Sequence, residues 1–536
     1  MKIGIYLGYG PKTVLSKEGL GRYTGNLVRN LQKRGNRIVI ACPKWLKGSL
    51  KDLWEDLQIQ EDSIEYIAAS KVPVVWRMYL KYTGKAHQKK RLHMDYARVI
   101  EFIVNQLLSI TSIVLFGLSL LLGGFFLLLL APFLLLAGML YLILYLLSKL
   151  KKSGSKKAKR MMKWMMSIYG RAEQGGLDVY NRIYAKFIEN VQKELVRKIN
   201  RKKDIDIWYS PAIFWPTFND VEGVKIVNVP DLVTETFATK WGSYRDILYS
   251  TKQCEKTIEA NTDFIVYSNF IKDGLLMKKF GKQEERISVI PHPMNDLSGY
   301  VTINSEAAGK LARTEIFTEQ YCKTILQSLG SHTKGIDDYI IGYDFSDVTY
   351  IFYASQGRPH KNLKNLIKAY EYLLRKKYVR VKLFLTCNMN ELPEVWDYII
   401  EKRLQYDVIS FFNVTTKELA ALYRQAQLVV NPTLYEGGFP FTFGEGMSVG
   451  TPSVMSRIPQ VLEVVDGYDL EDVLFDPYNM YDIAEKLKYG LENRESLFSR
   501  ESVLYHDLLK NNEEKNGAMY EEVFNKAIFR SRNRND

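Results

Sequence analysis

The stretch NPTLYEGGFPFTFGEGMSVGTP, residues 431–452, decides the fold of this chain. It follows an apolar run, residues 428–430, which predicts a buried strand. Pro432 then begins a turn, so Glu436 places a carboxylate at the end of that strand. Carboxylates accept hydrogen bonds from sugar hydroxyls, which makes Glu436 the first candidate for a binding site.

Glycines follow this acid and lead into a helix. Gly437 and Gly438 have no side chains, so their backbone amides are accessible to a ligand. The pattern that follows predicts a helix from Thr442 with Glu445 in its first turn. Backbone amides and a helix dipole attract a phosphate. Acids beside a phosphate-binding loop favour a nucleotide sugar as ligand. The alternative is a glycine-rich turn with solvated acids.

The stretch resembles the donor motif of retaining glycosyltransferases with the GT-B architecture, glycosyltransferase family 4-like, also called group 1. In that family two glutamates separated by seven residues precede a small residue and a Gly-Thr-Pro or Gly-Cys-Pro turn, and residues 450–452 match the turn. Here eight residues, 437–444, separate the glutamates. The resemblance implies that Glu436 positions the transferred sugar and Glu445 holds the ribose. It also implies donor contacts from Gly437, Gly438 and Phe439.

Length and composition indicate a folded protein of more than one domain. The chain has 536 residues, of which 46% are hydrophobic and 25% charged, and its net charge is +14. A positive net charge favours binding to nucleic acid, to an anionic membrane or to phosphorylated substrates. The four cysteines are widely spaced without a CxxC pair, which argues against a disulfide framework or a zinc site and favours a reducing cytosol.

The N-terminal segment predicts a βαβ unit. Residues 3–8 and 38–41 are expected strands, and the helix between them follows the glycines Gly19 and Gly21. Glycines at a helix start allow a ligand or another loop to come close, and a tight turn is the alternative. By resemblance, Gly19 and Gly21 meet the donor phosphates across the interdomain cleft.

A long uncharged segment interrupts this pattern. Residues 102–148 contain 47 residues without a charge, which is too long for one membrane-spanning helix and suits two. Lysine and arginine dominate both flanks, so both ends are expected on the cytoplasmic side of an inner or cytoplasmic membrane. The segment therefore predicts a helical hairpin, with a re-entrant wedge as the alternative to a full crossing.

A basic cluster at 149–163 follows the hairpin and borders a methionine-rich segment at 161–166. This combination predicts an interfacial helix on anionic lipid, with nucleic-acid binding as the rival explanation of the charge. Helical apolar spacing continues through residues 180–203, which we interpret as a linker helix back to the soluble domain.

Two acidic positions follow in the resumed α/β pattern. Asp204 and Asp206 form a D-x-D, which indicates the solvated edge of a strand rather than a metal site. Asp231 ends a later strand, where α/β sheets place ligand-contacting residues. The resembling family has histidine before this aspartate and this chain has Pro230. A catalytic role and a helix-capping role for Asp231 both remain open.

A cationic loop in the second half completes the candidate site. A strand starting at Val348 leads to a loop with Arg358, His360 and Lys361, followed by a helix. Fixed cations near a helix start neutralise the charge that builds on a diphosphate leaving group, and solvated surface cations are the alternative. The loop resembles the Arg and Lys diphosphate clamp of the same family, so Arg358 and Lys361 are assigned to leaving-group charge.

These patterns predict an α/β fold of GT-B type, with two Rossmann-like domains that face a cleft and a membrane hairpin inserted in the first. The expected activity is transfer of a hexose from UDP- or GDP-sugar, with retention, to a lipid-linked glycan, with no bound metal or other cofactor and no nucleic-acid partner. A non-catalytic membrane scaffold with the same fold is the alternative. The predicted parts are the N-terminal domain in two pieces (1–95 and 204–305), the hairpin with its basic segment (96–166), a linker helix (167–203), the C-terminal nucleotide-sugar-binding domain (306–510) and a C-terminal helix and tail (511–536).

Overall fold

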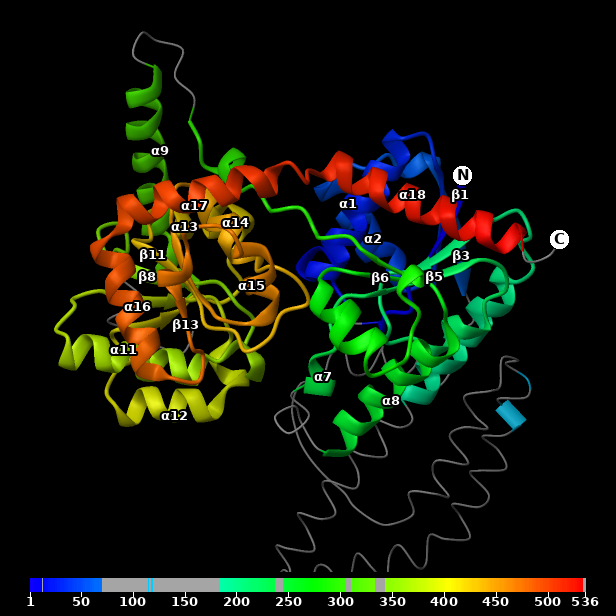
Figure 1. Ribbon diagram of the computed structural model, residues 1–536, viewed down its shortest axis with the longest axis horizontal. Helices are drawn as coiled ribbons and strands as arrows, with labels where there is room; N and C mark the ends of the chain where they lie inside the picture. Colours follow the sequence, from blue (N-terminus) through cyan, green and yellow to red (C-terminus); the bar gives the residue numbers. More distant parts are fainter. Residues whose placement is uncertain are drawn as a thin grey trace, which may run out of the picture.

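Two α/β domains make up the described part of the chain. Each contains a parallel sheet with helices packed around it (Figure 1). This confirms the predicted α/β class with two parallel sheets. The computed structural model describes residues 1–11, 13–69, 114, 117–118, 184–236, 244–303, 310–332 and 343–533.

The N-terminal sheet has seven strands in the order β3-β2-β1-β4-β5-β6-β7. Its central strands β1 and β4 are buried along almost their whole length because helices cover both faces. The order reverses between β1 and β4, which marks the point where doubly wound sheets bind ligands. The strands are β1 (Lys2–Tyr6), β2 (Arg37–Pro43), β3 (Ile64–Ala69), β4 (Ile207–Ser210), β5 (Lys225–Val229), β6 (Phe264–Val266) and β7 (Ile287–Val289).

A helix at residues 184–199 belongs to the core of this domain. Its apolar stripe, which includes Phe187, Val191 and Leu195, is buried against strands β1 and β4 in one hydrophobic cluster. It is therefore a core helix, which corrects the linker role that we predicted for it. The other helices here are α1 (Gly19–Lys33), α2 (Leu46–Asp56), α7 (Val233–Thr236), α8 (Tyr244–Ala260) and a π-helix, η4 (Phe270–Met277).

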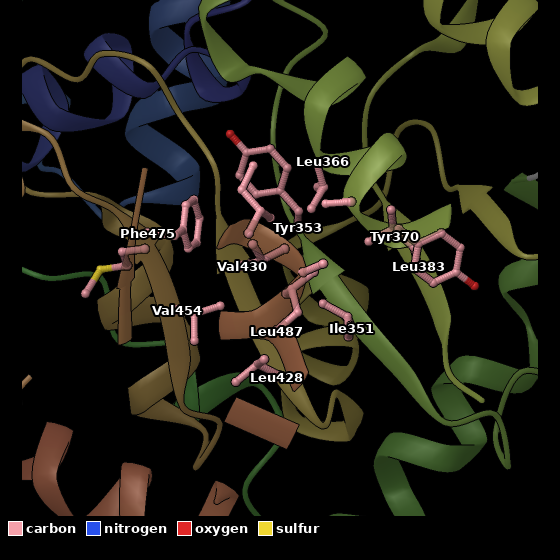
Figure 2. Close-up of a cluster of buried hydrophobic side chains, with 14 of the residues drawn as sticks. Ile351, Tyr353, Leu366, Tyr370, Leu383, Leu428, Val430, Val454, Phe475 and Leu487 are labelled. Atoms are coloured by element: carbon pink, nitrogen blue, oxygen red, sulfur yellow. The ribbon is translucent and has the colours of Figure 1, made fainter. Parts of the chain in front are cut away.

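The C-terminal sheet has six strands in the order β10-β9-β8-β11-β12-β13, which repeats the doubly wound pattern. Figure 2 shows its core, where side chains such as Ile351, Leu428 and Val454 from neighbouring strands pack against Leu366 and Leu487. The strands are β8 (Tyr350–Tyr353), β9 (Lys382–Leu385), β10 (Val408–Ser410), β11 (Leu428–Asn431), β12 (Ser453–Ser456) and β13 (Leu474–Phe475). The helices are α9 (Lys310–Gln327), α11 (Leu363–Lys376), α12 (Pro393–Glu401), α13 (Thr416–Gln425), α14 (Phe441–Ser448), α15 (Pro459–Val465), α16 (Met480–Glu492) and α17 (Arg494–Leu509).

The last helix, α18 (Glu513–Arg532), returns to the N-terminal domain (Figure 1). It packs along α1, and the side chains of Tyr520 and Phe524 are fully buried in the core around β1 and β4. Burial of two large aromatic rings contributes several kcal/mol to the attachment of the helix. The end of the chain is therefore a structural part of the first domain.

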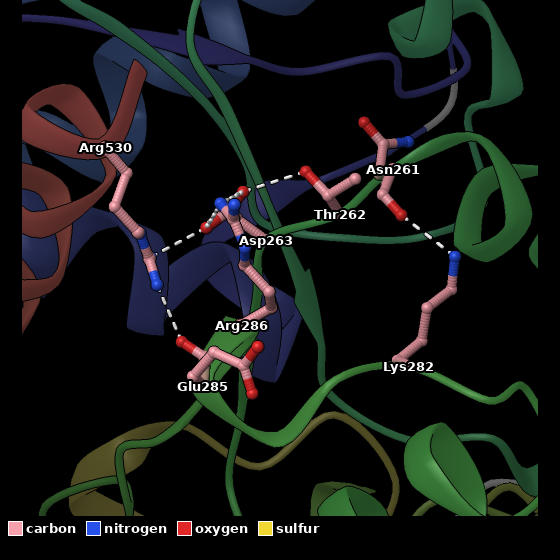
Figure 3. Close-up of polar contacts among 7 residues, drawn as sticks. All are labelled: Asn261, Thr262, Asp263, Lys282, Glu285, Arg286 and Arg530. Atoms are coloured by element: carbon pink, nitrogen blue, oxygen red, sulfur yellow. Dashed lines mark hydrogen bonds and ion pairs between the residues drawn. The ribbon is translucent and has the colours of Figure 1, made fainter. Parts of the chain in front are cut away.

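Charge pairing fixes the far end of α18 (Figure 3). Arg530 donates from Nη2 to Asp263 Oδ1 at 2.7 Å and from Nη1 to the carbonyl of Glu285 at 2.6 Å. Arg286 donates to the other oxygen of Asp263 at 3.1 Å. A buried carboxylate needs such pairing to offset its lost hydration, so Asp263 ties α18 to the β6 and β7 edge of the sheet.

The chain enters the C-terminal domain earlier than we predicted. Leu297 and Val301, assigned above to residues 204–305 of the first domain, are buried in the core of the second. The predicted membrane hairpin at 102–148 lies outside the described residues except for positions 114, 117 and 118, and the basic segment at 149–163 lies outside them entirely. Among the helices of the described ranges, none has the length and apolar character to cross a membrane.

We expect Phe524→Ala to destabilise the protein by about 3–5 kcal/mol, because it leaves a cavity in the core that α18 shares with the N-terminal sheet. Phe529→Ala on the same helix is the matched control, since Phe529 is 65% exposed. Urea unfolding of both variants, followed by circular dichroism, measures the difference. Equal midpoints for the two variants would contradict the structural role of α18.

Candidate active site

Two loops meet where the C-terminal strand order reverses. Strand β11 pairs with β8 in parallel, so the loops after these strands leave the sheet side by side. The β8 loop contains a short 3-10 helix, η8 (Pro359–Lys361), and the β11 loop carries Glu436. Lys361 Nζ lies 2.5 Å from Glu436 Oε1, and each side chain is 20% exposed. The structure thus brings together a predicted phosphate ligand and a predicted sugar ligand.

Backbone and amide hydrogen bonds hold these two loops in register. The N–H of Leu434 donates to the carbonyl of His360 at 2.8 Å. Asn362 adopts a left-handed conformation, with φ of 57°, and its side chain donates to the carbonyls of Pro432 and Pro477 at 3.0 and 2.7 Å. Sequence reasoning did not identify Asn362 as a support for the site. Its position directly before a helix was the available signal.

His360 is a buried neutral side chain between the two cations of the loop. Burial lowers the pKa of His360 to about 3, and the charges of Lys361 and Arg358 lower it further in the same direction. An uncharged imidazole adds no third positive charge to the loop. The predicted cations Arg358 and Lys361 therefore flank a neutral spacer.

Asp231 of the N-terminal domain lies within electrostatic reach of this loop. Burial raises the pKa of its carboxyl group, whereas a hydrogen bond from the Val233 N–H and the charge of Arg358 lower it. The charge of Glu436 raises the pKa of Asp231 and that of Lys361 lowers it. The other three residues predicted to be catalytic thus act on the pKa of Asp231 from across the domain boundary. The Val233 contact, at 3.4 Å, also makes Asp231 a local cap, so both predicted roles stay open.

Gly437 and Gly438 form the contact between the domains. A Cβ atom on Gly437 would lie 1.8 Å from the carbonyl oxygen of Pro230, and one on Gly438 would lie 3.0 Å from Tyr267 Cβ. Ser268 Oγ donates to the carbonyl of Gly437 at 2.9 Å. Glycine is required at 437 because the loop touches the backbone of the other domain. The donor contacts predicted for these glycines remain predictions.

The second glutamate is held by protein side chains. Helix α14 begins at Phe441, one residue before the predicted start, so Glu445 lies in its second turn rather than its first. Its carboxylate accepts hydrogen bonds from Asn295 Nδ2 at 2.8 Å and from the Tyr423 hydroxyl at 2.7 Å. Phe439 is buried in the C-terminal core beside Phe443, and the donor contact predicted for it remains a prediction.

Gly19 and Gly21, the glycines predicted to meet the donor phosphates, lie at the start of α1 and have different surroundings. A Cβ on Gly21 would lie 2.4 Å from the carbonyl of Leu15, which supports the tight-turn explanation for this glycine. A Cβ on Gly19 would meet nothing within 4 Å. The acidic pair Asp204 and Asp206 binds Lys2, through its ammonium at 2.6 Å and its backbone N–H at 2.7 Å, which fits a solvated strand edge.

His292 is a further interdomain residue that sequence reasoning missed. Its ring stacks on Phe441 with centroids 3.8 Å apart and an interplanar angle of 22°. Burial lowers the pKa of His292 to about 4, so the ring is neutral near pH 7. The residue follows β7, at the edge of the sheet that faces the C-terminal domain, and it packs at the base of the glycine loop.

Known proteins resemble this chain in part. Residues 344–502 match the model of the family described as glycosyl transferases group 1. The matched residues lie within the C-terminal domain. The O-antigen chain mannosyltransferase B of Escherichia coli is 29% identical over 146 residues, and the serotype-specific mannosyltransferase WbdA of Escherichia coli is 31% identical over 139 residues. These matches span 27% and 25% of this chain and only 37% and 16% of the two relatives.

Solved structures match nearly the whole chain. Anabaena HepE, crystallised with UDP and glucose, has a TM-score of 0.55 at 11% identity, and the match covers 98% of this chain and all of HepE. A glycosyltransferase from Rickettsia africae has a TM-score of 0.52 at 12% identity, with 98% of each chain covered. At such low identity the likeness shows the fold, which is that of the GT-B proteins.

We expect Gly437→Ala to push the two domains apart, because the added methyl group would overlap the Pro230 carbonyl. Small-angle X-ray scattering should show a larger radius of gyration for this variant than for the wild type. Gly48→Ala in α2 is the control, since a Cβ there meets nothing within 4 Å. An unchanged radius for Gly437→Ala would show that the loop does not set the domain spacing.

Proposed function

We propose that this chain is a membrane-associated retaining glycosyltransferase that moves a hexose from a UDP- or GDP-sugar to a lipid-linked glycan in polysaccharide synthesis. The observation that carries the proposal is the contact between Lys361 and Glu436 at the reversal point of the C-terminal sheet. Lys361 provides a partner for the diphosphate of a nucleotide sugar, and Glu436 provides one for its sugar. Arg358 and Asp231 lie within electrostatic reach of each other beside this pair.

The charges of these residues fit the chemistry of transfer. As the bond between the sugar and the diphosphate breaks, its electron pair moves to a phosphate oxygen, and negative charge grows on the leaving group. Arg358 and Lys361 are assigned to that charge. An acceptor hydroxyl forms the new bond to the same sugar carbon and gives its proton to an oxygen of the departing diphosphate. Glu436 is assigned to hold the sugar, and its contact with Lys361 links sugar placement to leaving-group stabilisation.

The comparisons support the substrate classes in this proposal. Both curated relatives are named as mannosyltransferases, and one of them is named as an O-antigen chain mannosyltransferase, which supports a hexose donor and a glycan acceptor. HepE was solved with UDP, which supports a nucleoside diphosphate as the donor's other half. Metal independence and retention rest on the resemblance of the motif at residues 431–452. Membrane association and a cytoplasmic catalytic face rest on the sequence of residues 102–163.

We expect Lys361→Ala to reduce turnover of the preferred nucleotide sugar at least about tenfold, because a lost charge-assisted contact costs about 1.5–3 kcal/mol. Release of UDP and GDP from a panel of hexose donors, assayed in membranes, identifies the donor and measures the effect. Lys364→Ala is the matched control, since Lys364 is a surface residue of α11 whose contact with Glu394 measures 3.5 Å. Unchanged kinetics in Lys361→Ala would remove the phosphate clamp from the proposal.

We expect Glu436→Gln to abolish turnover while nucleoside diphosphate binding persists or strengthens, because Lys361 is then freed from its acidic partner. Calorimetric titration with UDP and with GDP measures binding independently of catalysis. Wild-type membranes without turnover of any donor would favour the non-catalytic scaffold instead.

We expect deletion of residues 102–148 to spare hydrolysis of the donor but to depress transfer to a lipid-linked acceptor. Holding the cleft at the bilayer raises the effective concentration of such an acceptor. The ratio of transfer to lipid-linked and to soluble acceptors should therefore fall in the deletion variant. An unchanged ratio would contradict membrane proximity as the role of this segment.

A further inference from the structure

Tyr435 precedes Glu436 in the C-terminal domain, yet its ring lies in the core of the other domain. It is 2% exposed and belongs to the hydrophobic cluster of the N-terminal sheet, beside Leu232. Its ring meets Phe270 edge to face with centroids 6.3 Å apart. The β11 loop therefore inserts an aromatic side chain into its partner domain.

The hydroxyl of Tyr435 joins the two acidic segments of the site. It accepts a hydrogen bond from the backbone N–H of Leu232 at 3.0 Å, and Leu232 directly follows Asp231. On the other side, the carbonyl of Tyr435 accepts from Thr433 Oγ1 at 2.9 Å. Tyr435 thus lies between the segment of Asp231 and the segment of Glu436, with its side-chain hydroxyl and its backbone carbonyl both hydrogen-bonded.

Other polar contacts across the domain boundary surround this tyrosine. Ser268 Oγ donates to the Gly437 carbonyl at 2.9 Å, two residues after Tyr435. Glu463 of α15 accepts from the backbone N–H of Phe270 at 3.2 Å, at the start of η4. Burial and the nearby charges of Asp231 and Glu436 raise the pKa of Tyr435, so its hydroxyl stays protonated.

We propose that Tyr435 is a positioning residue that couples closure of the two domains to the placement of Glu436. When the domains are closed, the ring and the Leu232 hydrogen bond fix the backbone immediately before Glu436. When they separate, the ring leaves its apolar site, Leu232 N–H loses its partner and Glu436 loses that support. This inference rests on the proposed function only for the role of Glu436, because the interdomain contact is independent of it.

The kinetic test compares tyrosine variants that each lose one buried hydroxyl. We expect Tyr435→Phe to lower kcat about fivefold to tenfold with the donor KM within about twofold, because substrate still binds while Glu436 is less often in place. Tyr370→Phe is the matched control, since Tyr370 is fully buried and donates to the Val381 carbonyl at 2.7 Å. A kcat for Tyr435→Phe equal to that of the control would overturn the proposal.

Domain closure is measured separately in the full chain. Spin labels at Phe214→Cys and Ile400→Cys, which are 44% and 47% exposed, report the distance between the domains with UDP or GDP present. The four native cysteines are buried, which favours labelling at the introduced sites. We expect Tyr435→Ala to shift the distance distribution to longer values than Tyr370→Phe does. Identical distance distributions for the two variants would overturn the coupling. Absence of turnover in the wild type would refute the proposed function, but the distance measurement would remain valid.

Discussion

The close approach of the β11 loop to the N-terminal domain is the constraint on which the site depends. No side chain fits at Gly437, because the carbonyl of Pro230 occupies the position of a Cβ atom. Once the loop is seated, Tyr435 enters the apolar cluster and Glu436 is directed back toward Lys361. The site therefore exists as a unit only when the two domains are together.

The charged residues of this site contribute little to the free energy of folding, but their electrostatic environment suits a functional role. Exposed ion pairs contribute about 0–1 kcal/mol, and partly buried ones lose hydration that offsets their attraction. The contact of Lys361 with Glu436 is thus weakly stabilising, although its groups lie close together. Burial also raises the pKa of Asp231, as expected for a carboxyl group that loses hydration. Such perturbed groups are characteristic of functional sites.

The sequence predicted those parts of the structure whose signal is local. The β11 loop, the helix that follows it and the cationic loop after β8 each form a contiguous pattern, so their positions at strand ends could be anticipated. Tyr435, Ser268 and His292 could not, because each acts through a contact with the other domain. The burial of the helix at 184–199 was missed because its apolar stripe shows that the helix packs but not which elements it packs against. The bonds of Glu445 to Asn295 and Tyr423 could not be anticipated either, because both partners are far from it in the sequence.

The connections between the domains limit how the cleft can open. The chain crosses from the first domain to the second after β7 and returns before α18. Both crossings meet at one carbonyl, because Asn511 and Asn516 each donate to Pro291 at 2.9 Å. Pro291 therefore lies where the two crossings meet, while the contacts of Tyr435 and Gly437 lie between the β11 loop and the N-terminal domain. His292 directly follows Pro291 and stacks on Phe441. Polar bonds thus join the domains at the crossings, and an aromatic ring and a glycine loop join them at the β11 loop.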